Sequence, residues 1–160
     1  MTHQLNFIYN DSDWVCPQEY PDLSQAKEIA IDLETKDPNL KTKGSGWATF
    51  DGAIVGFAVA ALGQQWYFPI QHDAGGNMDL GITTAWMQNV LKTPADKIFH
   101  NASYDVGWLL MNGFEIRGKI IDTMIAAAIV DENRFSFSLN ACSKDWLGEI
   151  KNETFLNEKA

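Results

Sequence analysis

The sequence predicts an α/β domain built on a mixed five-stranded sheet flanked by helices. Residues 53–61 and 66–70 are two strongly apolar runs separated by a short turn, which favours an antiparallel hairpin. In the second half of the chain, short apolar segments alternate with segments of helical period, and such units pair their strands in parallel through right-handed crossovers. We therefore expect strands one to three to be antiparallel, and strands one, four and five to be parallel.

The individual elements follow from apolar period and from terminating residues. Residues 5–8 are apolar enough for an edge strand, residues 22–26 suit a short helix, and residues 28–35 suit the first central strand. Residues 36–51 contain proline and glycine and are expected to form a loop. The later elements are a helix at 83–92, a strand at 97–100, a helix at 101–113, a strand at 119–121, and helices at 122–129 and 138–148. The polar tail, 149–160, is expected to fray unless more chain follows.

Two carboxylates stand near the end of the first central strand. Because side chains alternate across a strand, Ile31 and Leu33 point to one face, and Asp32 and Glu34 point to the other. Two acids on one face repel each other, and a divalent cation removes the conflict because Mg²⁺ and Mn²⁺ prefer carboxylate oxygens. A strand that simply enters solvent at Asp32 explains the same pair, and an isolated Asp-x-Glu favours that simpler explanation.

A third carboxylate follows a second short apolar strand. Asn101 comes directly after residues 97–100 and is a candidate N-cap for a helical pattern that places Asp105 in its first turn. If the two strands are neighbours in the sheet, Asp105 lies near the strand end that holds Asp32 and Glu34. Three carboxylates would then converge on one metal site.

The acids belong to three ordered motifs, Asp32-Leu33-Glu34-Thr35, Asn101-x-x-Tyr104-Asp105 and Asp122-Thr123-Met124-x-Ala126-Ala127. In this order and at this spacing they resemble the 3′–5′ proofreading exonuclease domain of family A DNA polymerases. That domain is a DnaQ-like, DEDD-type exonuclease on a ribonuclease H-like fold, and the resemblance extends from about residue 29 to about residue 148. Each motif alone is weak, whereas the ordered set is specific.

The resemblance implies hydrolysis of phosphodiester bonds with two divalent ions, Mg²⁺ or Mn²⁺. In that scheme Asp32 would bridge both ions. Glu34 would bind the ion that activates water, and Asp105 would hold the second ion, directly or through water. These three acids are therefore the expected catalytic and metal-binding residues.

The resemblance also implies substrate contacts from Thr35, Asn101 and Tyr104. Asn101 and Tyr104 also have structural explanations: Asn101 could cap the following helix, and Tyr104 could be an aromatic residue packed in the core. Asp122 is placed at a strand-to-helix junction, where it could be a further metal ligand or an N-terminal cap. We favour the structural role for Asp122.

One family element is missing from this sequence. The resemblance implies a tyrosine or histidine, three intervening residues and a fourth acid on a late helix, yet no tyrosine or histidine follows Tyr104. We therefore expect residues 1–160 to form a C-terminally incomplete exonuclease domain that binds metal weakly and cleaves slowly or not at all. The implied partners are the 3′ end of single-stranded DNA and a covalently linked polymerase domain.

Charge predicts weak affinity for nucleic acid. The formal net charge is −9 with only 12 Lys and Arg residues, whereas most nucleic-acid-binding proteins present a basic patch. The densest basic cluster, Lys36, Lys41 and Lys43, lies in the expected loop. That loop is either simply solvated or flanks the entry of a single strand, with Trp47 or Phe50 available to stack on bases.

Composition excludes several other classes of protein. No apolar run is long enough for a membrane-spanning helix, and the first residues lack the pattern of a signal peptide. Cys16 and Cys142 form no metal-ligand spacing and no disulfide framework, so we expect reduced cysteines in a cytoplasmic protein.

Three alternatives remain open at this point. An RNA-processing exonuclease of the RNase D type shares the three motifs and would prefer RNA on matched single strands. A non-catalytic module that uses the same fold for binding or scaffolding is favoured by the missing fourth acid. A generic α/β domain with acids placed by chance is the third alternative, because short single motifs often mislead.

Overall fold

A computed structural model of the chain describes residues 15–73 and 75–148. Its elements, in chain order, are β1 (Glu28–Lys36), α1 (Leu40–Lys43), α2 (Gly46–Thr49), β2 (Ala53–Ala61), β3 (Gln64–Pro69), α3 (Leu80–Lys92), β4 (Asp96–Phe99), α4 (Ala102–Met111), β5 (Ile120–Asp122), α5 (Thr123–Val130) and α6 (Leu139–Leu147). The expected edge strand at 5–8 and the polar tail at 149–160 lie outside the described residues.

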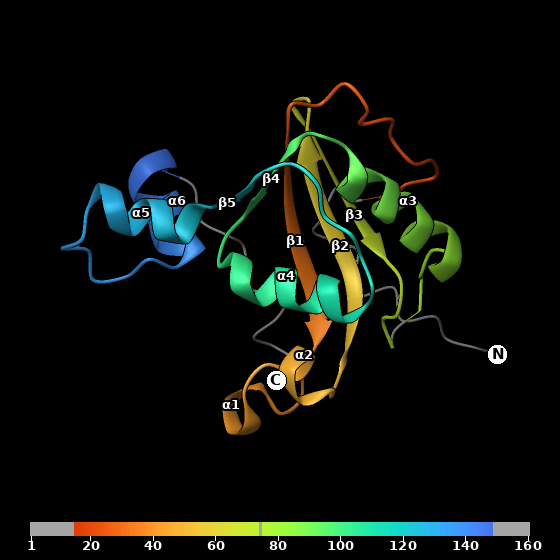
Figure 1. The fold of residues 1–160 in the computed structure, drawn as a ribbon, viewed down its shortest axis with the longest axis horizontal. Coiled ribbons are helices and arrows are strands. Elements are labelled where there is room, and N and C mark those ends of the chain that lie inside the picture. Colours follow the sequence, from red (N-terminus) through yellow and green to blue (C-terminus); the bar gives the residue numbers. More distant parts are fainter. Residues whose placement is uncertain (1–14, 74, 149–160) are drawn as a thin grey trace.

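The five strands form one sheet in the order β3-β2-β1-β4-β5, with β1 at its centre (Figure 1). The pairs β1–β2 and β2–β3 are antiparallel, and the pairs β1–β4 and β4–β5 are parallel. This arrangement confirms the predicted mixed sheet. Its consequence for the site is that β1, which carries Asp32 and Glu34, and β4, which precedes Asp105, are direct neighbours.

The hairpin between β2 and β3 turns through two residues, Leu62 and Gly63. Both have positive φ, at 54° and 74°, as the tightest hairpin turns require. The turn is therefore shorter than the sequence suggested, and β3 begins at Gln64.

The core lies between the sheet and the helices α3 and α4. Ile29, Ile31 and Leu33 of β1 are buried with Met87 of α3 and Trp108 of α4. The opposite side of the sheet, which we call the open face, presents the alternating β1 residues Ala30, Asp32 and Glu34 together with Ala58 of β2 and Tyr67 of β3. The predicted division of β1 into an apolar face and an acidic face is confirmed.

The sequence interpretation was wrong about the segment before β1. Residues 22–26 form a turn, not a helix, in which Asp22 accepts a hydrogen bond from the Ser24 amide at 2.9 Å and the Ala26 amide bonds to the Leu23 carbonyl at 3.1 Å. The Asp22 side chain offers the backbone a local alternative to helical bonds, and a five-residue helix is intrinsically unstable.

The expected loop after β1 instead contains the two one-turn helices α1 and α2. Asp37 accepts a hydrogen bond from the Gly46 amide at 2.9 Å, which closes the segment between them. A Cβ atom at Gly46 would lie 2.8 Å from the Trp108 ring, so this glycine permits α2 to pack closely on α4. The packing of α2 on α4 thus orders part of a segment whose composition predicted a loop.

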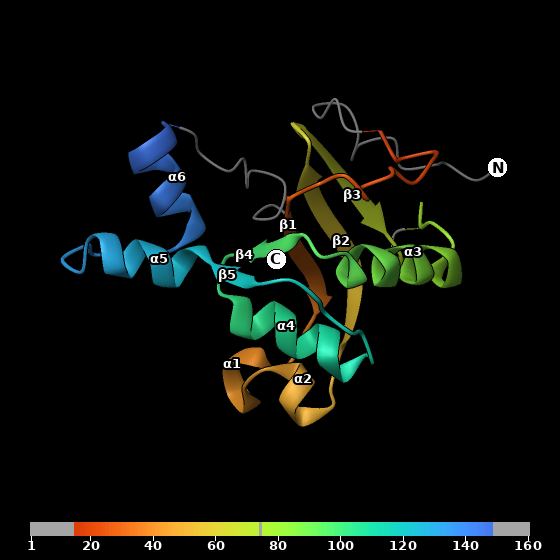
Figure 2. The ribbon, with the colours of Figure 1, turned by 45° about the horizontal axis from the view of Figure 1, so that its top comes forward.

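The helices α5 and α6 extend beyond the β5 edge of the sheet, away from α3 (Figures 1 and 2). α5 buries Ala127 but leaves Ile125, Ile129 and Val130 exposed. His100 joins this unit to β4, because its ring nitrogens bond Thr123 Oγ1 at 2.9 Å and the Phe137 carbonyl at 2.8 Å. Within the described residues, no helix is long and apolar enough to cross a bilayer.

Candidate active site

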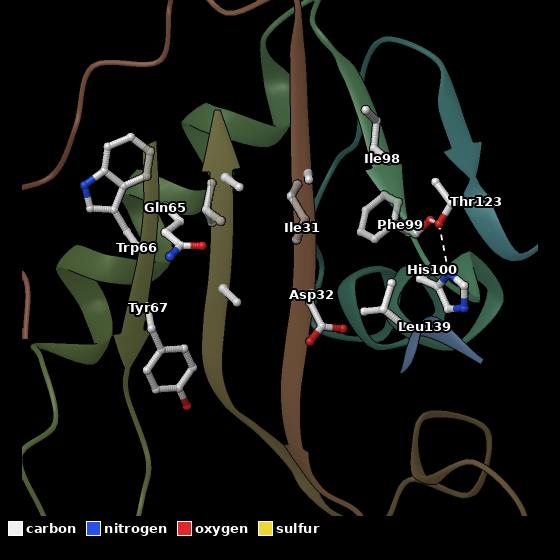
Figure 3. Close-up of a pocket in the computed structure, with 14 residues that line it drawn as sticks. Ile31, Asp32, Gln65, Trp66, Tyr67, Ile98, Phe99, His100, Thr123 and Leu139 are labelled. Carbon is white, nitrogen blue, oxygen red and sulfur yellow. Dashed lines mark hydrogen bonds between the residues drawn. The ribbon is translucent and has the colours of Figure 1, made fainter. Parts of the chain in front are cut away.

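Asp32 and Glu34 lie exposed on the open face of β1, as their alternation with Ile31 and Leu33 requires. Asp32 borders a pocket of about 480 Å³ on this face. Figure 3 shows the Asp32 carboxylate projecting from β1, with β3 on one side and His100 on the other. The two acids are therefore accessible to a ligand.

Asp105 reaches the same strand from α4. β1 pairs with β4 only over Glu28–Ala30, so β1 continues beyond the last residue of its parallel neighbour. The first turn of α4 occupies this position, and Asp105 Oδ1 accepts a hydrogen bond from the Leu33 amide at 3.3 Å. Asp105 is only 3% exposed.

The charges of the predicted acids act on one another. Burial, followed by the negative charges of Asp32, Asp122 and Glu34, raises the pKa of Asp105 to about 7, although the Leu33 amide opposes the shift. The charges of Asp32 and Glu34 therefore act on the buried Asp105 carboxyl group. Carboxylates are the donor type that hard divalent cations prefer.

Asp122 acts as a cap for two helices. It accepts hydrogen bonds from the Met124 and Ile125 amides at the start of α5, at 2.9 Å and 3.3 Å. It also accepts from the amides of Asn101 and Ala102 at the start of α4, at 3.2 Å and 2.8 Å. Burial raises its pKa, but these four backbone bonds together outweigh burial and hold the pKa below the usual range. The structural role favoured for Asp122 is confirmed.

Asn101 does not cap α4 with its side chain, which corrects the sequence interpretation. Its backbone is left-handed, with φ 70° and ψ 55°, and its side chain makes no capping bond. Its Oδ1 instead accepts from Ser103 Oγ at 3.1 Å. The reason is that Asp122, 21 residues later, already binds the first amides of α4.

Tyr104 connects α4 to the chain that leaves β1. Its hydroxyl donates to Asp37 Oδ2 at 2.9 Å and is 2.8 Å from Thr35 Oγ1. Because the Tyr104 proton is used on Asp37, the Thr35 hydroxyl is the donor to Tyr104. Burial raises the pKa of Tyr104. Two of the three expected substrate-binding residues, Thr35 and Tyr104, are therefore hydrogen-bonded to each other beside the acids.

Sequence reasoning missed Tyr67 and gave His72 no role. The Tyr67 hydroxyl bonds to His72 Nε2, and burial and then the charge of Glu34 raise the Tyr67 pKa far above its usual value. The signal that could have found Tyr67 is the alternation of side chains along the strands, because cross-strand partners share a face. Tyr67 pairs with Ala58, and Ala58 pairs with Asp32. Tyr67 therefore shares the open face with the acids.

The aromatic residues proposed for base stacking have different environments. Trp47 packs on α4, where a Cβ atom at Gly107 would lie 2.7 Å from the indole nitrogen, so its ring is committed to packing. Phe50 is 86% exposed and has a left-handed backbone with φ 57°. Of the basic cluster, Lys36 pairs with Asp73 at 2.8 Å.

The side chains at this site are of the types that bind divalent ions, but within the described residues they are not arranged as a metal site. In residues 15–73 and 75–148, no three His, Cys, Asp or Glu side chains are arranged to hold a metal ion. The donor types are nevertheless those that Mg²⁺ prefers, and the charges of Asp32 and Glu34 both act to raise the pKa of Asp105. The same described residues contain two free cysteines, Cys16 and Cys142.

A family model described as 3′–5′ exonuclease matches residues 20–157. The chain belongs to this family. It is 32% identical over 161 residues to a DNA-directed DNA polymerase of Pseudomonas phage M6, a match that covers 96% of this chain and 24% of the polymerase. The chain thus spans about a quarter of this curated relative.

Two solved structures share the fold of this chain. Escherichia coli RNase D, an exoribonuclease involved in structured RNA processing, matches 82% of this chain and 31% of its own, with 17% identity and a TM-score of 0.59. Brucella melitensis NrnC with bound Mg²⁺ matches 82% of this chain and 59% of its own, with 18% identity and a TM-score of 0.59. The expected ribonuclease H-like fold is confirmed by these neighbours.

Proposed function

We propose that this exonuclease domain removes nucleotides from the 3′ end of single-stranded DNA with two divalent ions, as the proofreading domain of a polymerase. The observation that supports the proposal most directly is the hydrogen bond from Leu33 to Asp105, which joins the third acid to the strand of Asp32 and Glu34. Membership of the 3′–5′ exonuclease family supports the direction of cleavage. The phage polymerase relative supports DNA as the substrate.

In this proposal Asp32, Glu34 and Asp105 are the metal ligands. Asp32 would serve both ion sites, Glu34 would serve the site that activates water, and Asp105 would hold the second ion directly or through water. Bound Mg²⁺ or Mn²⁺ would supply Lewis-acid stabilisation of the attacking and leaving oxygens. The chain's own part is to hold these acids in place, and the buried Asp105 is fixed by the Leu33 amide.

The substrate strand would lie along the residues that border the acids. Thr35 and Tyr104 form one hydrogen-bonded pair, which positions both groups beside the end of β1. Because Asp122 caps α4, the Asn101 side chain is not used as a cap, and its carboxamide lies at the start of α4, where Oδ1 accepts from Ser103 Oγ. The net charge of −9 predicts weak DNA affinity, and a covalently linked polymerase domain would offset this by raising the effective concentration of the substrate end.

The deciding experiment uses 5′-labelled single-stranded DNA with Mn²⁺, and compares this chain with its Asp32→Ala variant. Stepwise shortening from the 3′ end that disappears in the variant supports the proposal. We expect the rate to be low, because this sequence lacks the tyrosine or histidine and fourth acid that the family motif implies. Asp32-dependent Mn²⁺ binding without cleavage would indicate a metal site with an incomplete set of catalytic groups.

Metal titration tests the division of roles among the acids. We expect Asp32→Ala to remove most Mn²⁺ binding, and Asp105→Ala to weaken it less, because only the second ion depends on Asp105. An equal or larger loss in Asp105→Ala would contradict this division. Unchanged binding in Asp32→Ala would refute the metal site itself.

RNA is the second candidate substrate, favoured by the structural likeness to RNase D. Matched DNA and RNA single strands of one sequence separate the two, since RNA preference requires recognition of the 2′-hydroxyl. A non-catalytic scaffolding role predicts neither cleavage nor Asp32-dependent Mn²⁺ binding.

A further inference from the structure

Tyr67 reaches across the sheet to the acids from two strands away. Tyr67 of β3 pairs with Ala58 of β2, which pairs with Asp32 of β1, so the three residues lie in one row of the open face. Figure 3 shows the Tyr67 ring and the Asp32 carboxylate extending toward the same end of the pocket. The small side chain of Ala58 between them leaves room for this approach.

Gly56 sets how far the tyrosine hydroxyl extends. A Cβ atom at Gly56 would lie 2.8 Å from Tyr67 Cε2 and would collide with the hydroxyl oxygen, so the ring lies directly over this glycine. Gly56 is the β2 partner of Glu34. Because paired residues of adjacent strands are about 5 Å apart, the hydroxyl lies one strand away from Glu34.

His72 holds that hydroxyl from the other side. Tyr67 and His72 are hydrogen-bonded through Nε2, with their rings edge to face at 5.8 Å. Asn77 fixes the His72 backbone, because it accepts from the His72 amide at 2.8 Å and donates to the His72 carbonyl at 2.9 Å. This loop histidine is therefore held in place on both its ring and its main chain.

We propose that Tyr67, oriented by His72, is a positioning residue for Glu34 in the metal site. This inference rests on the proposed two-metal function. When His72 Nε2–H donates to the tyrosine oxygen, the Tyr67 proton is available to a second acceptor, and we infer that this acceptor is the Glu34 carboxylate. A metal-binding carboxylate held by a hydrogen bond keeps its orientation, and the loss of such support commonly costs 10–100-fold in metal affinity.

Calorimetric titration of the intact chain with Mn²⁺ tests this role, with Tyr67→Phe as the variant and Tyr20→Phe as the matched control. Tyr20→Phe also removes a hydroxyl hydrogen bond, which Tyr20 makes to Thr83 Oγ1 at 2.7 Å. That bond joins the segment before β1 to α3, not to the acids. We expect Tyr67→Phe to weaken Mn²⁺ binding about 10-fold or more, and Tyr20→Phe to leave it unchanged. Thermal unfolding in chelator separates lost stability from lost affinity.

A double-mutant cycle with His72→Ala tests whether the histidine acts through the tyrosine. We expect His72→Ala to weaken Mn²⁺ binding. The Mn²⁺ affinity of the double variant should equal that of Tyr67→Phe, because both substitutions remove the same interaction. Mn²⁺ affinity within twofold of the parent in Tyr67→Phe, while Asp32→Ala abolishes binding, would overturn this inference alone. If Asp32→Ala binds Mn²⁺ as tightly as the parent chain does, the proposed function and this inference are overturned together.

Discussion

The Leu33 amide donates to Asp105 Oδ1 across 3.3 Å, so a backbone group between Asp32 and Glu34 fixes the third acid. This contact joins residues 72 positions apart and depends on β1 extending beyond β4. It leaves a buried carboxyl group close to two exposed ones. Without a bound cation, this arrangement of charges is therefore electrostatically unfavourable.

Asp105→Asn should stabilise the metal-free protein at neutral pH. The folded pKa of Asp105 is raised to about 7 from 3.8, so its contribution to stability is complete below pH 4 and is lost as the pH rises through 7. Asparagine keeps the acceptor for Leu33 without the charge. We expect the variant's gain in unfolding free energy to grow from near zero at pH 4 to about 2–4 kcal/mol at pH 8.

Urea unfolding in chelator measures this gain, and Glu28→Gln, on the exposed start of the same strand, controls for the loss of one charge. Added Mn²⁺ should reverse the order, because the parent gains more from the cation than the variant. A gain that does not change between pH 4 and pH 8 would show that Asp105 titrates normally.

Asp122→Ser separates the two caps that Asp122 makes. Serine can cap α5, but its single oxygen cannot also hold the two amides at the start of α4. We expect a loss of about 1–2 kcal/mol in unfolding free energy. Asp79→Ser is the control, because Asp79 caps only α3, through the Ile82 amide. Equal effects of the two substitutions would contradict the bridging role.

Lys97→Met should destabilise the fold strongly. Lys97 is fully buried, and its ammonium group donates to the carbonyls of Thr93, Ala95 and Arg117 at 2.9, 2.7 and 2.9 Å. Methionine fills the space but leaves these carbonyls without their donor, at a cost of about 2–4 kcal/mol. Chemical denaturation should show a far smaller change for the exposed Lys119→Met, and comparable losses for both would refute this network.

Gly107→Ala tests the close packing of α2 on α4. A Cβ atom at position 107 would lie 2.7 Å from Trp47 Nε1, so we expect a loss of about 1–3 kcal/mol. Gly81→Ala in α3 meets only Asp79 Oδ1 at 3.4 Å, and there alanine should gain up to about 1 kcal/mol from its helix preference. Opposite signs in thermal unfolding are the expected result, and a gain at both positions would contradict the crowding at Gly107.

The sequence by itself determined the local elements and the chemistry of β1. Strand alternation placed Ile31 and Leu33 inside and Asp32 and Glu34 outside, and both assignments are confirmed by burial. The period of the apolar residues, together with terminating glycine and proline residues, predicted the sheet and the order of the helices in the second half of the chain. These features depend on neighbours one to four residues apart, which a single sequence displays directly.

Only the tertiary structure decided which distant groups meet. The capping of α4 by Asp122 rather than by Asn101, the bond from Leu33 to Asp105, and the passage of Tyr67 over Gly56 each join separate elements of the fold. Such contacts depend on strand register and on where each strand ends, and neither is encoded in local period. The helix α2 formed for the same reason, because packing against Trp108 ordered part of a segment whose own composition favoured a loop.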